Sequence, residues 1–91
     1  MLTLEINGQT SATVRQGDVA SFEVLLDGGP AAEVLVDFEG SGAWEPAQGP
    51  VFCRGYQRAG RFVATVRCGD DTASARVRVT PVSVTGGAGL F

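Results

Sequence analysis

The sequence predicts an all-β protein built as an antiparallel two-sheet sandwich or barrel, with no helix. Apolar and polar residues alternate with a period of two in five separate segments, as they do in strands with one buried face. Twelve valines stand against six leucines and one isoleucine, a composition that favours strands. Clusters of Gly, Asp, Asn and Pro separate the segments and are typical of turns.

Each alternating segment predicts one strand, and the strands follow one another along residues 2–6, 21–26, 33–39, 61–68 and 73–80. The stretch from Gly40 to Pro50 lacks the alternation and is expected to form a long loop. The expected inward-facing residues are, in chain order, Leu2, Leu4 and Ile6; Phe22, Val24 and Leu26; Val34, Val36 and Phe38; Phe62, Ala64, Val66 and Cys68; and Ala73, Ala75, Val77 and Val79.

The last two segments predict a β-hairpin, with Asp70 and Asp71 as its two-residue turn. Every inward residue of one strand then faces an inward residue of the other, as a consistent register requires. The expected partners are Cys68 with Ala73, Val66 with Ala75, Ala64 with Val77, and Phe62 with Val79.

The composition excludes most enzymatic chemistry. The 91 residues contain no histidine and no lysine, so Ser-His and Cys-His pairs, Schiff bases and phosphate-binding P-loops are all absent. Two carboxylate pairs exist, Asp37 with Glu39 and Asp70 with Asp71, but a sandwich of this size offers no cleft to shift their pKa values. We therefore expect no catalytic residue.

The charges are distributed unevenly along the chain. The net charge of −3 argues against general binding of nucleic acid. Residues 1–50 hold eight carboxylates and one arginine (1 − 8 = −7), whereas residues 51–91 hold six arginines and two aspartates (6 − 2 = +4). The two halves either present oppositely charged poles to partners or neutralise each other in the fold.

The segment from Tyr56 to Cys68 resembles the PKD (polycystic kidney disease) domain pattern Tyr-x-x-x-Gly-x-Tyr-x-Val-x-Leu-x-Val. Gly17 and the run from Val36 to Gly40 also fit, the latter near the family's Trp-Asp-Phe-Gly-Asp-Gly. The resemblance covers about residues 11–82. It departs at Val36, where the family has tryptophan, and at the missing second aspartate.

The resemblance implies an immunoglobulin-like sandwich of about seven strands. Tyr56 is expected to form a tyrosine corner, with its hydroxyl bonded to nearby backbone, and Gly60 a tight entry into the next strand. Phe62 and Phe38 are expected to be structural residues of the core. Strand 61–68 would lie between strands 33–39 and 73–80.

That strand order brings outward arginines beside outward acids. The arginines are Arg61, Arg67, Arg76 and Arg78, and the acids are Glu33, Asp37 and Glu39. We favour a self-neutralised, solvated face over an arginine surface that binds a partner, and both interpretations stay open.

Trp44 lies in the irregular segment between Gly42 and Pro46. An exposed tryptophan on a loop can anchor a carbohydrate or a protein surface. Alternatively, the ring folds over an open edge of the sandwich and replaces the large ring missing at Val36. We favour the second interpretation.

One weak candidate for a metal site is present, in the pattern Asp37-x-Glu39-x-Ser41-Gly42. It is similar to the start of a calcium loop, but Gln48 occupies the position where an EF-hand has glutamate. Some PKD-like domains bind calcium, so the resemblance leaves a low-affinity calcium site open. Ordinary turn chemistry is favoured, and no other cofactor is expected.

Residues 1–85 are expected to form one domain, and the glycine-rich residues 86–91 a flexible tail or linker. No signal peptide and no stretch near ~20 apolar residues is visible. Cys53 and Cys68 are expected to stay unbridged, since strand 60–68 alone spans about 26 Å.

The resemblance implies a non-catalytic accessory module of a larger secreted or surface protein, such as a hydrolase. Its partners would be neighbouring domains or a protein or carbohydrate surface. The alternative is a stand-alone structural or assembly protein, of the surface or capsid decoration type, that acts through its sheet edges.

Overall fold

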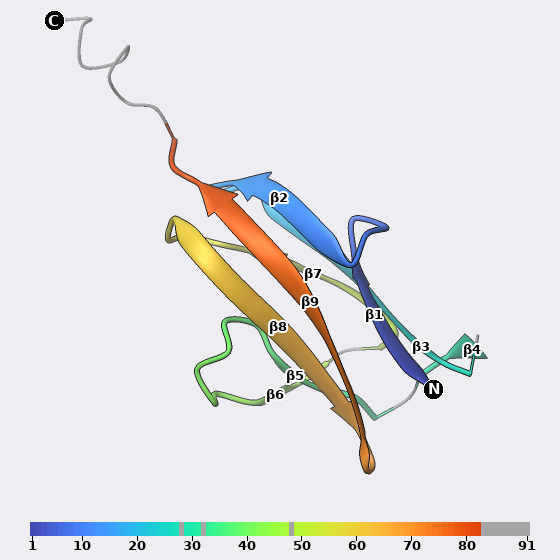
Figure 1. Ribbon diagram of the computed structural model, residues 1–91. Coiled ribbons are helices and arrows are strands. Elements are labelled where there is room, and N and C mark those ends of the chain that lie inside the picture. Colours follow the sequence, from blue (N-terminus) through green and yellow to red (C-terminus); the bar gives the residue numbers. More distant parts are fainter. Residues whose placement is uncertain (28, 32, 48, 83–91) are drawn as a thin grey trace, which may run out of the picture.

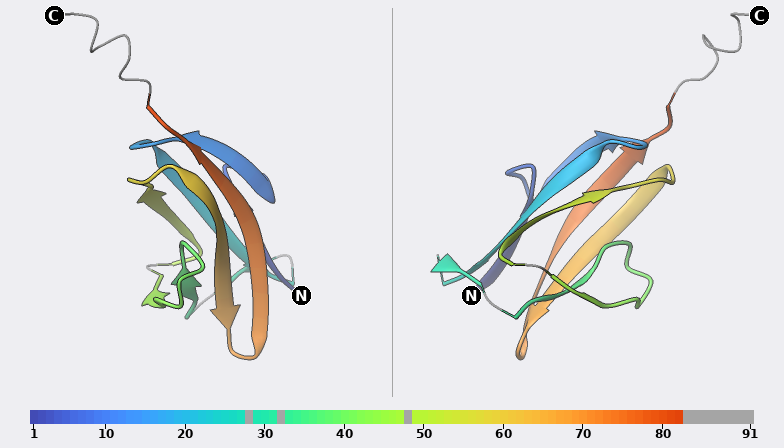
Figure 2. Two further views of the ribbon diagram at one scale, coloured as in Figure 1. Left: turned by 60° about the vertical axis from the view of Figure 1, so that its left-hand side comes forward. Right: turned by 180° about the vertical axis from the view of Figure 1, so that it is seen from behind.

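The computed structural model describes residues 1–27, 29–31, 33–47 and 49–82 of the chain. These residues form two β-sheets packed face to face, and the two layers are visible in Figure 1 and from the side in Figure 2. The predicted fold class, an immunoglobulin-like all-β sandwich, is confirmed. The tail predicted at residues 86–91 lies outside the described residues. No helix long and apolar enough to cross a membrane occurs in the described part.

Sheet A is organised around β3, which pairs with β1 on one side and with β7 and β4 on the other. All of its pairings are antiparallel. Its strands are β1 (Leu2–Ile6), β3 (Val19–Leu26), β4 (Gly29–Pro30) and β7 (Val51–Gly55).

Sheet B has the strand order β2-β9-β8-β5-β6. Strand β2 runs parallel to β9, and the other described pairs in this sheet are antiparallel. The chain crosses from sheet A to sheet B between β1 and β2, through a turn in which Asn7 and Gly8 have φ values of 52° and 79°. The strands are β2 (Ser11–Arg15), β5 (Leu35–Asp37), β6 (Glu45–Pro46), β8 (Gly60–Cys68) and β9 (Asp71–Thr80).

Aromatic rings fill one end of the core between the two sheets. Phe22 on β3 is fully buried, and its ring stacks on Phe52 at 5.3 Å and meets the edge of Phe38 at 5.2 Å. The ring of Tyr56 lies 6.4 Å from Phe22 on the same cluster. Such ring pairs each add about 0.5–1.5 kcal/mol beyond the area they bury, so this cluster is a major source of stability.

The hairpin of β8 and β9 forms, but its register differs from the predicted one by two residues. Cys68 pairs with Asp71 and not with Ala73, so the turn is Gly69-Asp70. Gly69 has a φ of 62°, the positive value needed at the first central position of a type II′ hairpin turn. Aspartate adopts this conformation less readily than glycine, and the glycine therefore sets the turn. The corrected pairs include Val66 with Ala73, Ala64 with Ala75, and Phe62 with Val77.

Strands β2 and β7 were not among the five segments predicted from alternation. In β7, Val51 and Cys53 point outward and Phe52 points inward. Apolar residues therefore occupy both faces of this strand, and the alternation of apolar and polar residues is absent. In β2, the inward residues are the small pair Ala12 and Val14. The described residues of the stretch from Gly40 to Pro50 are largely irregular, as predicted, except for the two residues of β6.

Candidate functional site

The outer face of sheet B carries most of the chain's arginines. Inward residues of β2, β8 and β9 alternate with outward ones, and the outward positions are rich in arginine. We call the outward surface of these three strands the arginine face. Five of the seven arginines belong to it: Arg15 from β2, Arg61 and Arg67 from β8, and Arg76 and Arg78 from β9.

Two of these arginines lie directly opposite each other. Arg61 on β8 pairs with Arg78 on β9, and Thr13 on β2 is the neighbour of Arg78 on the other side. Like charges in direct cross-strand positions are destabilising, by an amount comparable to the roughly 0.2–1 kcal/mol that opposite charges contribute. The fold therefore maintains this concentration of positive charge at a cost.

The three acids that were predicted to neutralise the arginine face form no ion pair with its arginines. Asp37 is buried at the end of β5 and accepts backbone hydrogen bonds, while Glu39 pairs with Arg58 at 3.0 Å. Glu33 is exposed ahead of β5 and forms no ion pair with a described residue. The prediction of a self-neutralised face is therefore wrong. The ion pairs among the described residues are Met1 with Asp27, Arg54 with Glu45, and Arg58 with Glu39.

The opposite outer face of the sandwich has the opposite sign. On sheet A, Glu5 of β1 lies directly across from Glu23 of β3. The outer face of sheet A thus has a pair of glutamates where the outer face of sheet B has arginines.

A run of three shallow hollows follows the arginine face along β8 and β9. The largest, of about 550 Å³, is lined by the side chains of Arg61, Arg76 and Arg78 together with Ser11 and Thr13 of β2. A second hollow of about 470 Å³ shares Ser11 and Arg76 with it, and a third of about 310 Å³ shares Arg61 and Arg78. Neighbouring hollows share lining residues and therefore lie side by side along the two strands, and we call this row of hollows the groove.

Trp44 lies beyond one end of this groove. Its side chain is partly exposed, with 38% of the residue accessible, and the guanidinium of Arg67 lies 4.9 Å from the centre of its ring. The ring therefore covers an arginine on the outside of sheet B. Val36 is buried in the core, and Trp44 is not among the residues that pack against that core. A cation–π contact at such an exposed site contributes about 0.5–1 kcal/mol.

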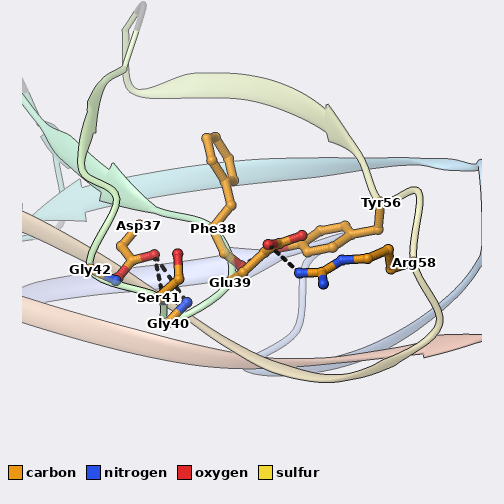
Figure 3. Close-up of polar contacts among 8 residues, drawn as sticks. All are labelled: Asp37, Phe38, Glu39, Gly40, Ser41, Gly42, Tyr56 and Arg58. Carbon is orange, nitrogen blue, oxygen red and sulfur yellow. Dashed lines mark hydrogen bonds and ion pairs between the residues drawn. The ribbon is translucent and has the colours of Figure 1, made fainter.

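The residues proposed for calcium form a closed loop around Asp37 (Figure 3). Its Oδ1 accepts hydrogen bonds from the backbone N–H groups of Gly40 at 3.0 Å and Ser41 at 3.1 Å, and its Oδ2 accepts one from Gly42 at 2.8 Å. The loop lies so close to β8 that a Cβ on Gly40 would be 3.1 Å from the carbonyl oxygen of Val63. Gly40 also has a positive φ of 73°, so the position requires glycine on two counts.

This geometry gives Asp37 a structural role in the loop. Three N–H donors converge on its carboxylate, and donors of this kind repel a cation. The side chain of Glu39 is directed to Arg58, away from Asp37 (Figure 3). No group of three or more His, Cys, Asp or Glu side chains able to hold a metal occurs within the described residues.

Tyr56 joins the ends of two strands from different sheets. It follows β7, is fully buried, and donates a 2.7 Å hydrogen bond from its hydroxyl to the carbonyl oxygen of Phe38, which follows β5 (Figure 3). The accepting carbonyl is 18 residues away in the sequence, whereas the predicted tyrosine corner would have bonded the hydroxyl to backbone near Tyr56. Burial, the largest cause, raises the pKa of Tyr56 to about 12. A neutral, hydrogen-bonded phenol is therefore part of the folded state.

The other residues predicted to be structural lie around Tyr56. The ring of Phe62 stacks on it at 5.5 Å, and Phe38 is buried in the core cluster. Gly60 opens β8 with a φ of 148°, a conformation that other residues rarely adopt. No disulfide joins Cys53, which is exposed on β7, to Cys68 on β8.

Catalytic groups are not gathered anywhere in the described structure. The sequence has no histidine, and the carboxylates of Asp70 and Asp71 are exposed at the β8–β9 turn. The arginine face has cationic and hydroxyl groups but no nucleophile with a base beside it.

These features define an immunoglobulin-like β-sandwich with one strongly basic outer face. No protein-family profile matches the chain, and no curated protein matches it either. Among solved structures, it is similar to the PKD domain of an M14-like peptidase from Thermoplasmatales archaeon SCGC AB-540-F20. That match has a TM-score of 0.50 and 14% identity, and it covers 88% of this chain and 93% of the other. The fold is PKD-like, in agreement with the resemblance noted in the sequence.

Proposed function

We propose that the chain is a non-catalytic PKD-like accessory module of a larger secreted or surface protein, such as a hydrolase. The observation that carries the proposal is the PKD-like fold, since the similar solved domain is named as part of a peptidase. Within that larger protein, the module would act as a spacer or as a unit that binds a protein or carbohydrate surface.

The residue inventory supports a binding or spacing role over a catalytic one. The chain has no histidine or lysine to act as a base near neutral pH. The hollow over β8 and β9 is lined by arginine and hydroxyl side chains together with Phe62, Val63 and Val77. The arginine and hydroxyl groups bind anions and sugars well but supply no activated nucleophile.

The size of the native protein tests the proposal. Cell and culture fractions are separated on a denaturing gel, and each band is digested with trypsin. Cleavage after Arg61 and Arg67 releases the peptide Phe62–Arg67, which identifies the band that contains this sequence. We expect it in a band far above the 9.4 kDa of this chain and in the extracellular or surface fraction. A band at 9.4 kDa would overturn the proposal and favour the stand-alone assembly protein.

A second experiment separates accessory from catalytic roles. The module is deleted from the parent hydrolase, and the kinetics are compared on a small soluble substrate and on the macromolecular substrate. We expect kcat/KM on the small substrate to stay within about two-fold, and activity on the macromolecule to fall. A loss of small-substrate turnover in an enzyme that remains folded would contradict the proposed role.

A further inference from the structure

We infer that the arginine face binds a linear anionic polysaccharide along the groove over β8 and β9. The inference identifies a ligand surface and its chemistry, and it holds whether the chain is a module or a stand-alone protein. Three observations support it: which of the seven arginines form ion pairs, the shape of the groove, and the side chains that line it.

The arginines divide into two groups with different surroundings. Arg54 and Arg58, which lie off the face, each form an ion pair with a glutamate, at 3.5 Å and 3.0 Å. The five on the arginine face form no ion pair with any described residue. Within strands β2, β5, β8 and β9, the one carboxylate at an outward position is Asp37, and its oxygens are taken by backbone donors. The face therefore has unmatched positive charge available to an external anion.

The arrangement of the arginines suits repeated anionic groups. Arg76 and Arg78 are two residues apart on one strand, about 6.6 Å, and Arg61 lies directly across from Arg78. Arginine presents a planar fork of donors that binds a carboxylate or sulfate through two parallel hydrogen bonds. A single small anion would occupy one such fork, whereas a chain with a charge on each unit would engage several.

The groove is long enough for a chain of this kind. Its three hollows follow one another from Ser74 to Pro81, and each shares residues with the next. Along β9, the six residue-to-residue steps from Ser74 to Thr80 span about 20 Å. An extended ligand would thus cross several strand positions, and its affinity would rise with its length.

The lining favours a sugar chain over a protein or a nucleic acid. Protein interfaces need buried aromatic or aliphatic anchors, and the large exposed apolar side chain in this groove is Val63. Single-stranded nucleic acid needs aromatic rings on which bases stack, and the ring of Trp44 lies outside the groove, against Arg67. The hydroxyls of Ser11, Thr13 and Ser74 can instead hydrogen-bond to sugar hydroxyls.

Two variants with the same change in charge test the inference. R61Q/R78Q removes two arginines from the groove, and R54Q/R58Q removes two from outside it. Binding of oligogalacturonate is measured by isothermal titration calorimetry at 20 mM and 300 mM NaCl, with neutral dextran as the uncharged control. Melting temperatures confirm that both variants are folded, and R61Q/R78Q is expected to be at least as stable as the original because it relieves a like-charge pair.

We expect the original chain and R54Q/R58Q to bind the hexamer within two-fold of each other, and more tightly than the galacturonate monomer. R61Q/R78Q should lose at least ten-fold in affinity, and 300 mM NaCl should weaken all binding. The inference is overturned if oligogalacturonate does not bind, if dextran binds equally well, or if both variants lose the same affinity. Tighter binding of polyglutamate or of a single-stranded DNA would assign the groove to a different class of partner and would also overturn it.

Discussion

The hydroxyl of Tyr56 donates a 2.7 Å hydrogen bond to the carbonyl oxygen of Phe38 and thereby connects the two sheets of the sandwich at one end. Tyr56 follows β7 of sheet A, and Phe38 follows β5 of sheet B. Both residues are buried, and their rings belong to the same aromatic cluster around Phe22. A polar bond in such a place stabilises the fold mainly because leaving its acceptor unpaired would be costly.

Removing the Tyr56 hydroxyl should therefore destabilise the protein. In Tyr56→Phe the ring packing stays, but the buried carbonyl of Phe38 loses its partner. We expect the free energy of unfolding, measured by urea denaturation, to fall by about 1–3 kcal/mol. The control is Thr65→Val, which removes a hydroxyl from the exposed 3.0 Å contact with Ser74 and should cost less than ~0.5 kcal/mol. Equal losses in the two variants would contradict the role given to the buried bond.

The same residue should make the protein sensitive to alkali. The pKa of Tyr56 is about 12 in the folded protein and about 10 in an unfolded chain. Since the folded state favours the protonated phenol, its contribution is fully present below pH 10 and is lost as the pH rises toward 12. The chain has one tyrosine and no lysine, and the variant Tyr56→Phe separates the contribution of this phenol from that of all other groups. We expect the stability of the original chain to fall steeply from pH 10 to 12, and that of Tyr56→Phe to change much less.

The sequence was sufficient to predict the strands of the hairpin but not its register. Alternation identifies which residues face inward, and a shift by two residues leaves every inward residue facing inward. The pairing of Phe62 with Val79 and the observed pairing with Val77 are therefore equally consistent with the pattern. The conformation of the turn decides between them, and Gly69 was the residue that indicated it.

The arginine face was predictable as a set of outward residues, whereas its lack of neutralising acids was not. The acids belong to a segment with clear alternation, from Glu33 to Glu39, and this alternation predicts one long strand. Strand β5 ends at Asp37, where the chain turns so that Gly40, Ser41 and Gly42 bond to its carboxylate. These hydrogen bonds occupy the carboxylate of Asp37 and end the strand before Glu39, which pairs with Arg58 instead, and alternation contains no information about such bonds.

A charge-reversal cycle tests the corrected register. In Arg61→Glu, the new carboxylate would lie opposite Arg78 and replace a repulsive pair with an attractive one. We expect each single reversal, Arg61→Glu or Arg78→Glu, to stabilise the protein by about 0.5–1 kcal/mol at low salt, and the double reversal to lose this gain. In the register predicted from alternation, Arg78 would face Val63, and the two reversals would act independently. Additive effects in urea denaturation would therefore contradict the observed pairing.

The closed loop around Asp37 should depend on its carboxylate and not on calcium. In Asp37→Asn, an amide N–H₂ would meet the N–H of Gly42 or of its neighbours, and we expect a loss of about 1–3 kcal/mol in the free energy of unfolding. The matched control is Glu39→Gln, which weakens an exposed ion pair with Arg58 and should cost no more than ~1 kcal/mol. Millimolar calcium should leave the melting temperature of the original chain unchanged, since N–H donors surround the carboxylate. A calcium-dependent rise that Asp37→Asn abolishes would instead establish a metal site.

The contact between Trp44 and Arg67 gives an optical measure of the electrostatic potential at this end of the arginine face. Trp44 is the single tryptophan and is partly exposed, so its emission should be red-shifted and accessible to quenchers. The guanidinium 4.9 Å from its ring should attract iodide, an anionic quencher, and repel caesium. We expect Arg67→Gln to reduce quenching by iodide while quenching by neutral acrylamide stays the same or increases, because the ring loses its cover. If iodide quenching is unchanged, or if iodide and acrylamide quenching fall together, the positive potential assigned to this surface is not felt at Trp44.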